Sequence, residues 1–172
     1  MSKNNQVIVR ARNLTKKYDG KKVVDSISFE VYKGEIFGIL GPNGAGKTTT
    51  LEMLEALRPI DSGEASLGGH DIVTNSEKIK ALIGVQPQSP SFEEKTKLTE
   101  LIEFFSSTYG EKVDPMDFLK SVQLEDKANS YPEDLSGGQR QRFSFSSALV
   151  HNPPVFFLDE PTTGLPPHPP PT

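Results

Sequence analysis

The alternation of apolar and polar residues predicts two half-buried strands near the start of the chain. They cover residues 8–14 and 27–31. The apolar residues expected on one face of the second strand are Ile27, Phe29 and Val31. Residues 35–40 form a more continuously apolar run that ends at a glycine. This pattern is typical of a buried parallel strand that leads into a loop.

Shorter elements are predicted in the next part of the chain. A helix is expected over 46–57, because Pro59 cannot continue it. Four more segments follow in order: a turn at 61–63, a strand at 64–67, a helix at 76–82 and a strand at 83–85.

The middle of the chain changes to a helical pattern. The first helix has apolar residues at i, i+3, i+4 and i+7, and Thr96 or Thr99 is its expected cap. Those apolar residues are Leu98, Leu101, Ile102 and Phe105. Two more helices are predicted at 114–122, with Pro115 in its first turn, and from Ser136 to about Leu149. Residues 90–150 therefore form a helical insert, and the pattern returns to a buried strand at 155–158.

Composition narrows the possible functions. The chain has 172 residues and a net charge of −4, which counts against nucleic acid as the main partner. It has no cysteine, which excludes thiol catalysis and cysteine–metal sites and fits a reducing compartment. The first ten residues do not have the pattern of a signal peptide. The most apolar run, 155–158, is far too short to span a bilayer, so a membrane function requires a separate membrane partner.

A glycine-rich loop carries the strongest chemical signal. It matches G-x-x-x-x-G-K-[ST] with Gly41, Pro42, Asn43, Gly44, Ala45, Gly46, Lys47 and Thr48. Glycines allow backbone N–H groups to turn toward phosphate oxygens, and the following helix presents its positive end. Lys47 would reach the β- and γ-phosphates, and the Thr48 hydroxyl would ligate Mg²⁺. The alternative is a glycine-rich turn without a ligand.

Two carboxylates follow the strand at 155–158. Asp159 would hold Mg²⁺, largely through water, and Glu160 would orient or deprotonate the attacking water. An exposed acidic turn is the alternative interpretation.

A second glycine motif consists of Ser136, Gly137, Gly138 and Gln139. Ser136 is a good helix N-cap, which is the simpler interpretation. The functional interpretation is an anion site in which the hydroxyl, the glycine amides and the helix dipole point at a γ-phosphate.

Together these motifs resemble the ATP-binding cassette (ABC) ATPases. The resemblance covers residues 7–165, through GPNGAGKTT at 41–49, LSGGQRQR at 135–142 and FFLDEPTTGL at 156–165. It implies an α/β P-loop NTPase (RecA-like) core with a β-rich N-terminal part and an inserted helical subdomain at about 90–150. It also places Thr49 among the nucleotide-binding residues.

The resemblance implies head-to-tail dimers, homomeric or heteromeric, that sandwich two ATP molecules. Each ATP would lie between the loop 41–48 of one chain and residues 136–139 of the second cassette. The residues around 83–110 and the sequence DEPTTGL look most like cassettes of bacterial exporters, including drug-efflux systems.

Two further positions carry over from the family. Tyr18 lies where the family places an aromatic ring that stacks on adenine, although a packing tyrosine is the alternative. Gln88 matches the glutamine that contacts Mg²⁺ and the attacking water, and Gln86 is the second candidate because the family glutamine usually follows a proline. The segment 86–97 would then contact a membrane subunit.

The end of the chain departs from the family pattern. The family has an aspartate where this chain has Pro166, and neither His151 nor His168 matches the family's switch histidine. We therefore expect a cassette truncated after about residue 165, with missing core strands and a proline-rich, non-family tail at 166–172. A natural minimal protein is the alternative.

The expected function is that of an ATPase subunit that powers transport through a separate transmembrane permease. It would be cytoplasmic and peripheral on the inner face of the cell membrane, with ATP and Mg²⁺ as ligands. The alternatives are a truncated cassette that binds ATP but hydrolyses it poorly, and a soluble cassette protein that acts on ribosomes or DNA.

Overall fold

The computed structural model describes residues 6–87 and 91–159. The chain divides into two compact units, with the boundary between Ile83 and Gly84. The expected positions Gln88 and Glu160, and the tail at 166–172, lie outside the described residues.

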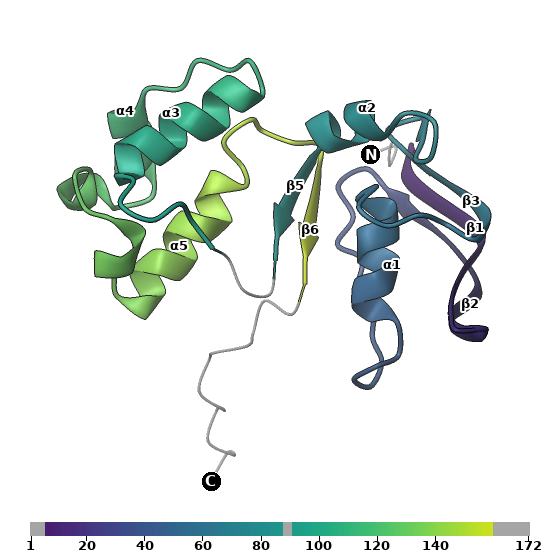
Figure 1. The fold of residues 1–172 in the computed structure, drawn as a ribbon. Helices are drawn as coiled ribbons and strands as arrows, with labels where there is room; N and C mark the ends of the chain where they lie inside the picture. The colour runs from purple at the N-terminus through teal and green to yellow at the C-terminus, as the bar shows by residue number, and fades with distance from the viewer. Residues whose placement is uncertain (1–5, 88–90, 160–172) are drawn as a thin grey trace, which may run out of the picture. The chain divides into compact units, whose positions relative to one another are not determined.

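The first unit is built on a four-stranded antiparallel sheet of order β2-β1-β3-β4 (Figure 1). The strands are β1 (Val7–Tyr18), β2 (Lys21–Tyr32), β3 (Ser62–Leu67) and β4 (His70–Asp71). Asp19 and Gly20, with φ of 49° and 76°, form the two-residue hairpin turn between β1 and β2. The two predicted N-terminal strands are confirmed and are longer than the alternation indicated.

The pairing of β1 with β2 explains the predicted apolar face. Buried residues of β1 lie opposite the three apolar residues of β2, in the pairs Val9–Val31, Ala11–Phe29 and Leu14–Ile27. The apolar sides of the two strands therefore belong to one core.

Helices α1 (Lys47–Leu54) and α2 (Ser76–Leu82) complete this unit. α1 lies against β2 and β3, with Met53 and Leu54 buried. The predicted end of α1 at residue 57 is wrong, because Ala56 takes a left-handed conformation with φ of 57°. The amides of Ala56 and Leu57 then return to the carbonyls of Met53 and Glu52, which is a Schellman ending.

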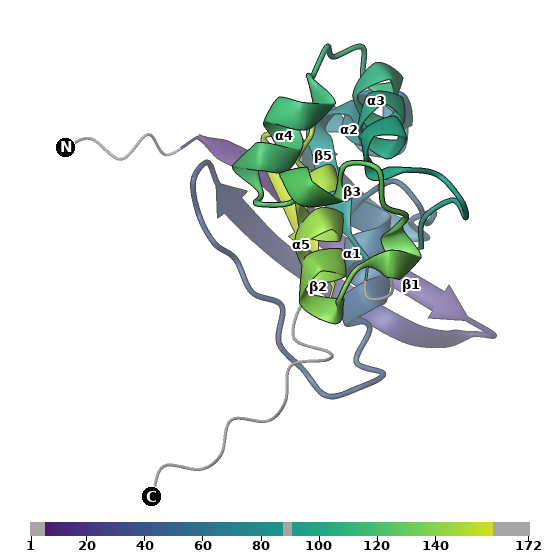
Figure 2. The same ribbon diagram turned by 90° about the vertical axis from the view of Figure 1, so that its left-hand side faces the viewer.

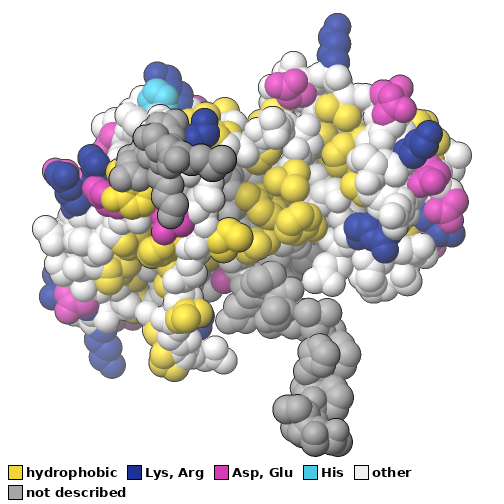
Figure 3. All heavy atoms as spheres, turned by 180° about the vertical axis from the view of Figure 1, so that it is seen from behind, with side chains coloured by type: hydrophobic (Ala, Val, Ile, Leu, Met, Phe, Trp, Pro, Cys, Tyr) yellow, Lys and Arg dark blue, Asp and Glu magenta, His cyan; other side chains and the backbone are white. Residues whose placement is uncertain are grey.

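The predicted buried strand at 35–40 is also wrong. These residues form no strand, and Ile36 and Leu40 are 101% and 95% exposed. A strand needs a ladder partner, and no described strand pairs with this segment. Phe37 stacks on Phe29 with ring centroids 5.0 Å apart. In the rear view of Figure 3, hydrophobic side chains lie at the surface between charged ones.

The second unit contains a two-stranded sheet and a group of helices. β5 (Ile83–Gln86) pairs with β6 (Val155–Leu158). The helices are α3 (Leu98–Thr108), α4 (Pro115–Ser121), α5 (Gly137–Ser147) and the 3₁₀ turns η1 (Glu125–Lys127) and η2 (Pro132–Asp134). Figure 2 shows α3, α4 and α5 grouped together, as does Figure 1.

These helices share one hydrophobic core. Its fully buried members include Leu98, Ile102, Leu119, Leu124 and Phe143. The predicted caps of α3, Thr96 and Thr99, are wrong. The Glu100 carboxylate instead accepts from the backbone N–H of Lys97 at 2.9 Å, which secures the first turn.

Candidate nucleotide-binding site

The glycine loop turns directly into the N-terminus of α1. Gly44 and Gly46 have φ of 80° and 83°, a conformation that side chains with a Cβ rarely adopt. Gly46 is also crowded, because a Cβ there would lie 2.5 Å from the carbonyl oxygen of Val23 on β2. The first turn of α1 has no acidic residue. The helix dipole therefore stays available for an anion in front of the loop.

The Lys47 ammonium lies within this loop. Its Nζ donates to the carbonyl oxygens of Gly41 and Pro42 at 3.0 and 3.1 Å. The Thr50 hydroxyl donates to the Gly46 carbonyl at 2.8 Å and is buried, so it secures the first turn of the helix. Thr48 is exposed. The loop thus combines a cation, an exposed hydroxyl and a helix N-terminus, which is the donor set that a nucleotide phosphate requires.

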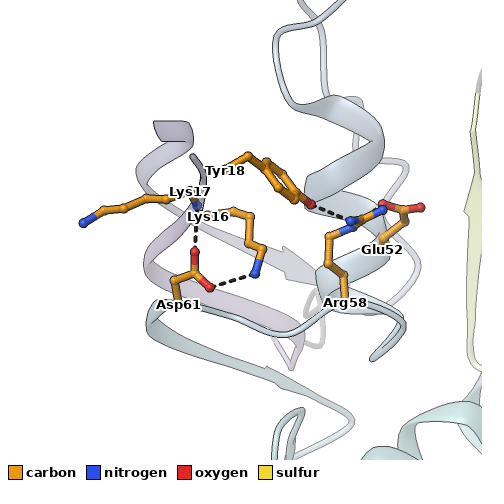
Figure 4. Close-up of polar contacts among 6 residues, drawn as sticks. All are labelled: Lys16, Lys17, Tyr18, Glu52, Arg58 and Asp61. Carbon is orange, nitrogen blue, oxygen red and sulfur yellow. Dashed lines mark hydrogen bonds and ion pairs between the residues drawn. The ribbon is translucent and has the colours of Figure 1, made fainter. Parts of the chain in front are cut away.

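Tyr18 is the last residue of β1 and is 38% exposed. Its hydroxyl accepts a hydrogen bond from Nη1 of Arg58 at 2.5 Å, and Nε of Arg58 donates to Glu52 at 2.6 Å (Figure 4). The Glu52 carboxylate raises the pKa of Arg58 above its ordinary value. No local sequence pattern indicates this arrangement, because Tyr18 and Arg58 are 40 residues apart.

A second polar connection lies beside Tyr18. Lys16 donates to Asp61 at 2.7 Å, and the other oxygen of Asp61 accepts from the backbone N–H of Lys17 at 2.7 Å (Figure 4). The hydrogen bond from Lys16 is the main cause that lowers the pKa of Asp61. The segment after α1 is thereby joined to the end of β1.

The second glycine motif lies in the other unit, at the N-terminus of α5. Ser136 Oγ accepts from the backbone N–H of Gln139 at 3.3 Å, and Gln139 Oε1 accepts from the N–H of Ser136 at 3.0 Å. This is a capping box, so the simpler interpretation of Ser136 holds as a structural fact. Gly137 and Gly138 are exposed, and a Cβ added to either would meet no atom of the described residues within 4 Å.

Asp159 follows β6 directly. Its backbone N–H donates to the Gln86 carbonyl at 3.2 Å, which brings the carboxyl ends of β5 and β6 together and makes the two strands parallel. The Gln86 side chain is buried, and its Oε1 accepts from Ser144 of α5 at 3.1 Å. Gln86 is the second candidate for the glutamine that contacts Mg²⁺ and the attacking water. Its side chain joins β5 to α5, the helix that begins at the second glycine motif.

The oxygen donors fit Mg²⁺ by type. A hydroxyl at Thr48 and a carboxylate at Asp159 are ligands that this ion prefers. Within residues 6–87 and 91–159, no three His, Asp or Glu side chains gather in a way that could hold a metal alone. Phosphate oxygens of the nucleotide usually complete the coordination of Mg²⁺ in nucleotide-binding proteins.

Membrane-spanning helices are a separate question. Among the described residues, every helix is too short or too polar to cross a bilayer.

A glycine loop of the form G-x-x-x-x-G-K-[ST] that opens a helix, in an α/β chain, is typical of the class of P-loop nucleotide-binding proteins. The ABC transporter family model matches residues 24–163. The chain belongs to the ABC transporter family, as its ATP-binding part.

Known proteins agree with this assignment. The Nod factor export ATP-binding protein I of Burkholderia thailandensis is 42% identical over 163 residues, or 91% of this chain and 53% of the relative. The linearmycin resistance ATP-binding protein LnrL of Bacillus subtilis is 38% identical, over 93% of this chain and 53% of the relative. The chain therefore spans about half the length of these curated relatives.

Solved structures show the same fold. An ATP-binding subunit of an ABC transporter superposes with a TM-score of 0.83 at 27% identity. The match covers 93% of this chain and 69% of that one. The expected fold class, an α/β P-loop NTPase with a β-rich N-terminal part and an inserted helical subdomain, is confirmed.

Proposed function

We propose that this chain binds and hydrolyses ATP and powers transport across a membrane through a separate transmembrane permease. The observation that carries the proposal is the glycine loop, in which left-handed Gly44 and Gly46 lead into α1 in a chain of the ABC transporter family. The relative named for Nod factor export supports an exporter. The proposed location is the cytoplasm, on the inner face of the cell membrane.

The residues of the loop bind the phosphates. Lys47 exchanges the carbonyls of Gly41 and Pro42 for the β- and γ-phosphate oxygens, while the amides at the start of α1 donate to the same chain of phosphates. Tyr18 stacks on adenine, and Thr49 lies in the first turn beside Thr48.

The remaining residues act at the bond that is cleaved. Thr48, Gln88 and Asp159 hold Mg²⁺, and Glu160 orients or deprotonates the attacking water. Bound Mg²⁺ supplies neutralisation of the charge on the phosphate oxygens.

A second cassette completes the site in this proposal. Its Ser136, Gly137, Gly138 and Gln139 contact the γ-phosphate across the dimer. The open space around both glycines supports this role, because among the described residues of their own unit nothing requires a glycine there.

One experiment tests the catalytic part. Phosphate release from MgATP should fall at least about 100-fold in Glu160→Gln, since a general base contributes about that factor or more. Glu77→Gln, which removes an exposed carboxylate paired with Lys80, is the matched control and should keep the wild-type rate. Equal rates for Glu160→Gln and wild type would contradict the proposal.

A second candidate function is ATP binding with poor hydrolysis. Pro166, in place of the family's aspartate, favours it. The same assay separates the two functions: MgATP binding that depends on Lys47, without phosphate release that depends on Glu160, indicates the binding-only protein.

A further inference from the structure

The segment that follows α1 fixes the end of the β1–β2 hairpin. Arg58 is placed by the Schellman ending of α1, where its own backbone N–H donates to the Glu52 carbonyl at 3.1 Å. Its guanidinium then bonds Glu52 through Nε and Tyr18 through Nη1. One planar fork thus joins a helix residue to an aromatic ring, which a flexible ammonium could not do in the same geometry.

Glu52 connects Tyr18 to the glycine loop, because Glu52 lies on the helix that begins in this loop. α1 starts at Lys47 in the glycine loop, and Glu52 follows about one and a half turns later. A helix is rigid over this length, so the Tyr18–Arg58–Glu52 chain sets the position of the ring relative to the phosphate loop within one unit.

A second anchor acts on the same strand end. Lys16 lies two residues before Tyr18 on β1, and its Nζ is 5.7 Å from the centre of the Tyr18 ring. Asp61 holds Lys16 through its side chain, and its backbone N–H donates to the Thr15 carbonyl at 3.2 Å. The end of β1 is therefore held to the segment after α1 by Lys16 and Asp61. Arg58 fixes a further group at this strand end, the hydroxyl of Tyr18.

We propose that Arg58 is a positioning residue. Arg58 is held by Glu52, and it fixes Tyr18 through the phenolic hydroxyl. The ring is then placed to stack on the adenine of an ATP molecule whose phosphates lie in the glycine loop. This inference rests on the proposed function. Arg58 donates to the phenolic hydroxyl of Tyr18 (Figure 4), and the central carbon of its guanidinium lies over the ring, 5.6 Å from the ring centre.

Two ligands distinguish positioning from general support. MgATP carries the base, and magnesium tripolyphosphate carries phosphates alone. Arg58→Ala and Tyr18→Phe should each weaken MgATP binding by about 3- to 10-fold, the range of one lost hydrogen bond, and should change tripolyphosphate binding by less than about 2-fold. The double variant should be no weaker than either single variant, because both remove the same bond. Isothermal titration calorimetry on the full chain measures all of these.

The matched control is Arg10→Ala. Arg10 pairs with Glu30 at 2.7 Å in the same unit, and its side chain is 41% exposed against 35% for Arg58. It should leave the affinity for both ligands at the wild-type value.

Three results would overturn the inference. Equal losses for both ligands in Arg58→Ala would mean that Arg58 only supports α1. Unchanged MgATP binding in Arg58→Ala and Tyr18→Phe, with a loss in Tyr18→Ala, would remove the role of Arg58 and leave the proposed function intact. Unchanged MgATP binding in Tyr18→Ala would remove both the role of Arg58 and the proposed role of Tyr18.

Discussion

At the scale of single residues, both the backbone conformation and the lack of space favour glycine at position 46. Its φ of 83° excludes most side chains, and β2 fills the space where a Cβ would lie. Gly44 shares the first constraint, with φ of 80°, but has open space. A comparison of the two glycines therefore separates two costs of adding a side chain: the cost of the left-handed backbone conformation and the cost of steric overlap with β2.

We expect Gly44→Ala to lower the free energy of unfolding by about 1–2 kcal/mol, the cost of a left-handed residue with a side chain. Gly46→Ala should cost more, because the added methyl group must also displace the Val23 carbonyl. Urea unfolding of both variants measures the difference. Equal losses would show that β2 yields to the methyl group without cost.

Asp61 is a residue whose charge state should affect stability. The Lys16 side chain, and then the Lys17 backbone N–H, hold its pKa below the ordinary 3.8. The folded chain thus binds this proton more weakly than the unfolded chain does. Its contribution to stability is complete above the ordinary pKa and is lost as the pH falls through the lowered value.

Wild type should therefore lose more stability than Asp61→Asn between about pH 5 and pH 3. Thermal unfolding at several pH values measures this. Asp25→Asn controls for the loss of one negative charge, because Asp25 forms an exposed ion pair with Lys22. A parallel pH dependence in wild type and Asp61→Asn would contradict the prediction.

At the scale of elements, α5 combines a stabilising cap with glycines that weaken the helix. Ser136 and Gln139 satisfy each other's backbone N–H groups, whereas Gly137 and Gly138 lie in the first turn with room for a side chain. Stability and the proposed γ-phosphate contact therefore place opposite demands on these neighbouring positions.

Ser136→Ala should lower the free energy of unfolding by about 1 kcal/mol, the usual cost of a lost N-cap. Gly137→Ala should raise it by up to about 1 kcal/mol, because alanine favours the helix. Gly137→Ala should nevertheless weaken ATP-dependent dimer formation, which size-exclusion chromatography of the Glu160→Gln background measures. A stabilised variant that still dimerises normally would argue against the contact.

At the scale of the whole molecule, the exposed apolar residues of the segment 35–40 are expected to promote self-association. Ile36 and Leu40 are almost completely exposed and Phe37 is 43% exposed, although the sequence pattern there is that of a buried strand. Apolar surface of this kind favours association between molecules.

Replacing both residues, as Ile36→Ser with Leu40→Ser, should reduce concentration-dependent self-association of this chain. Light scattering across a dilution series measures it. Val73→Ser with Leu57→Ser removes two exposed apolar side chains elsewhere in the same unit and is the control. Equal effects of the two double variants would show that the segment 35–40 promotes self-association no more than other exposed apolar side chains do.

The sequence by itself determined most of the helices and strands, and it predicted the chemistry of the site. Alternation placed both N-terminal strands, although their pairing, such as Val7 with Tyr32, joins distant positions. Local pattern placed α2, α3, α4 and α5, because the contacts within a helix join residues a few positions apart. The glycine loop and the motif at 136–139 were recognisable for the same reason, since each occupies one short stretch of chain. Membership of the ABC transporter family followed from the order of these motifs.

The tertiary structure alone decided which distant residues meet. The Arg58–Tyr18 bond joins positions 40 apart, and the Ser144–Gln86 bond joins positions 58 apart. It also decided that residues 35–40 form no strand, because a strand requires a partner that local pattern cannot supply. Local sequence fixes dihedral preference and amphipathicity, whereas hydrogen bonds between distant segments depend on how the whole chain packs.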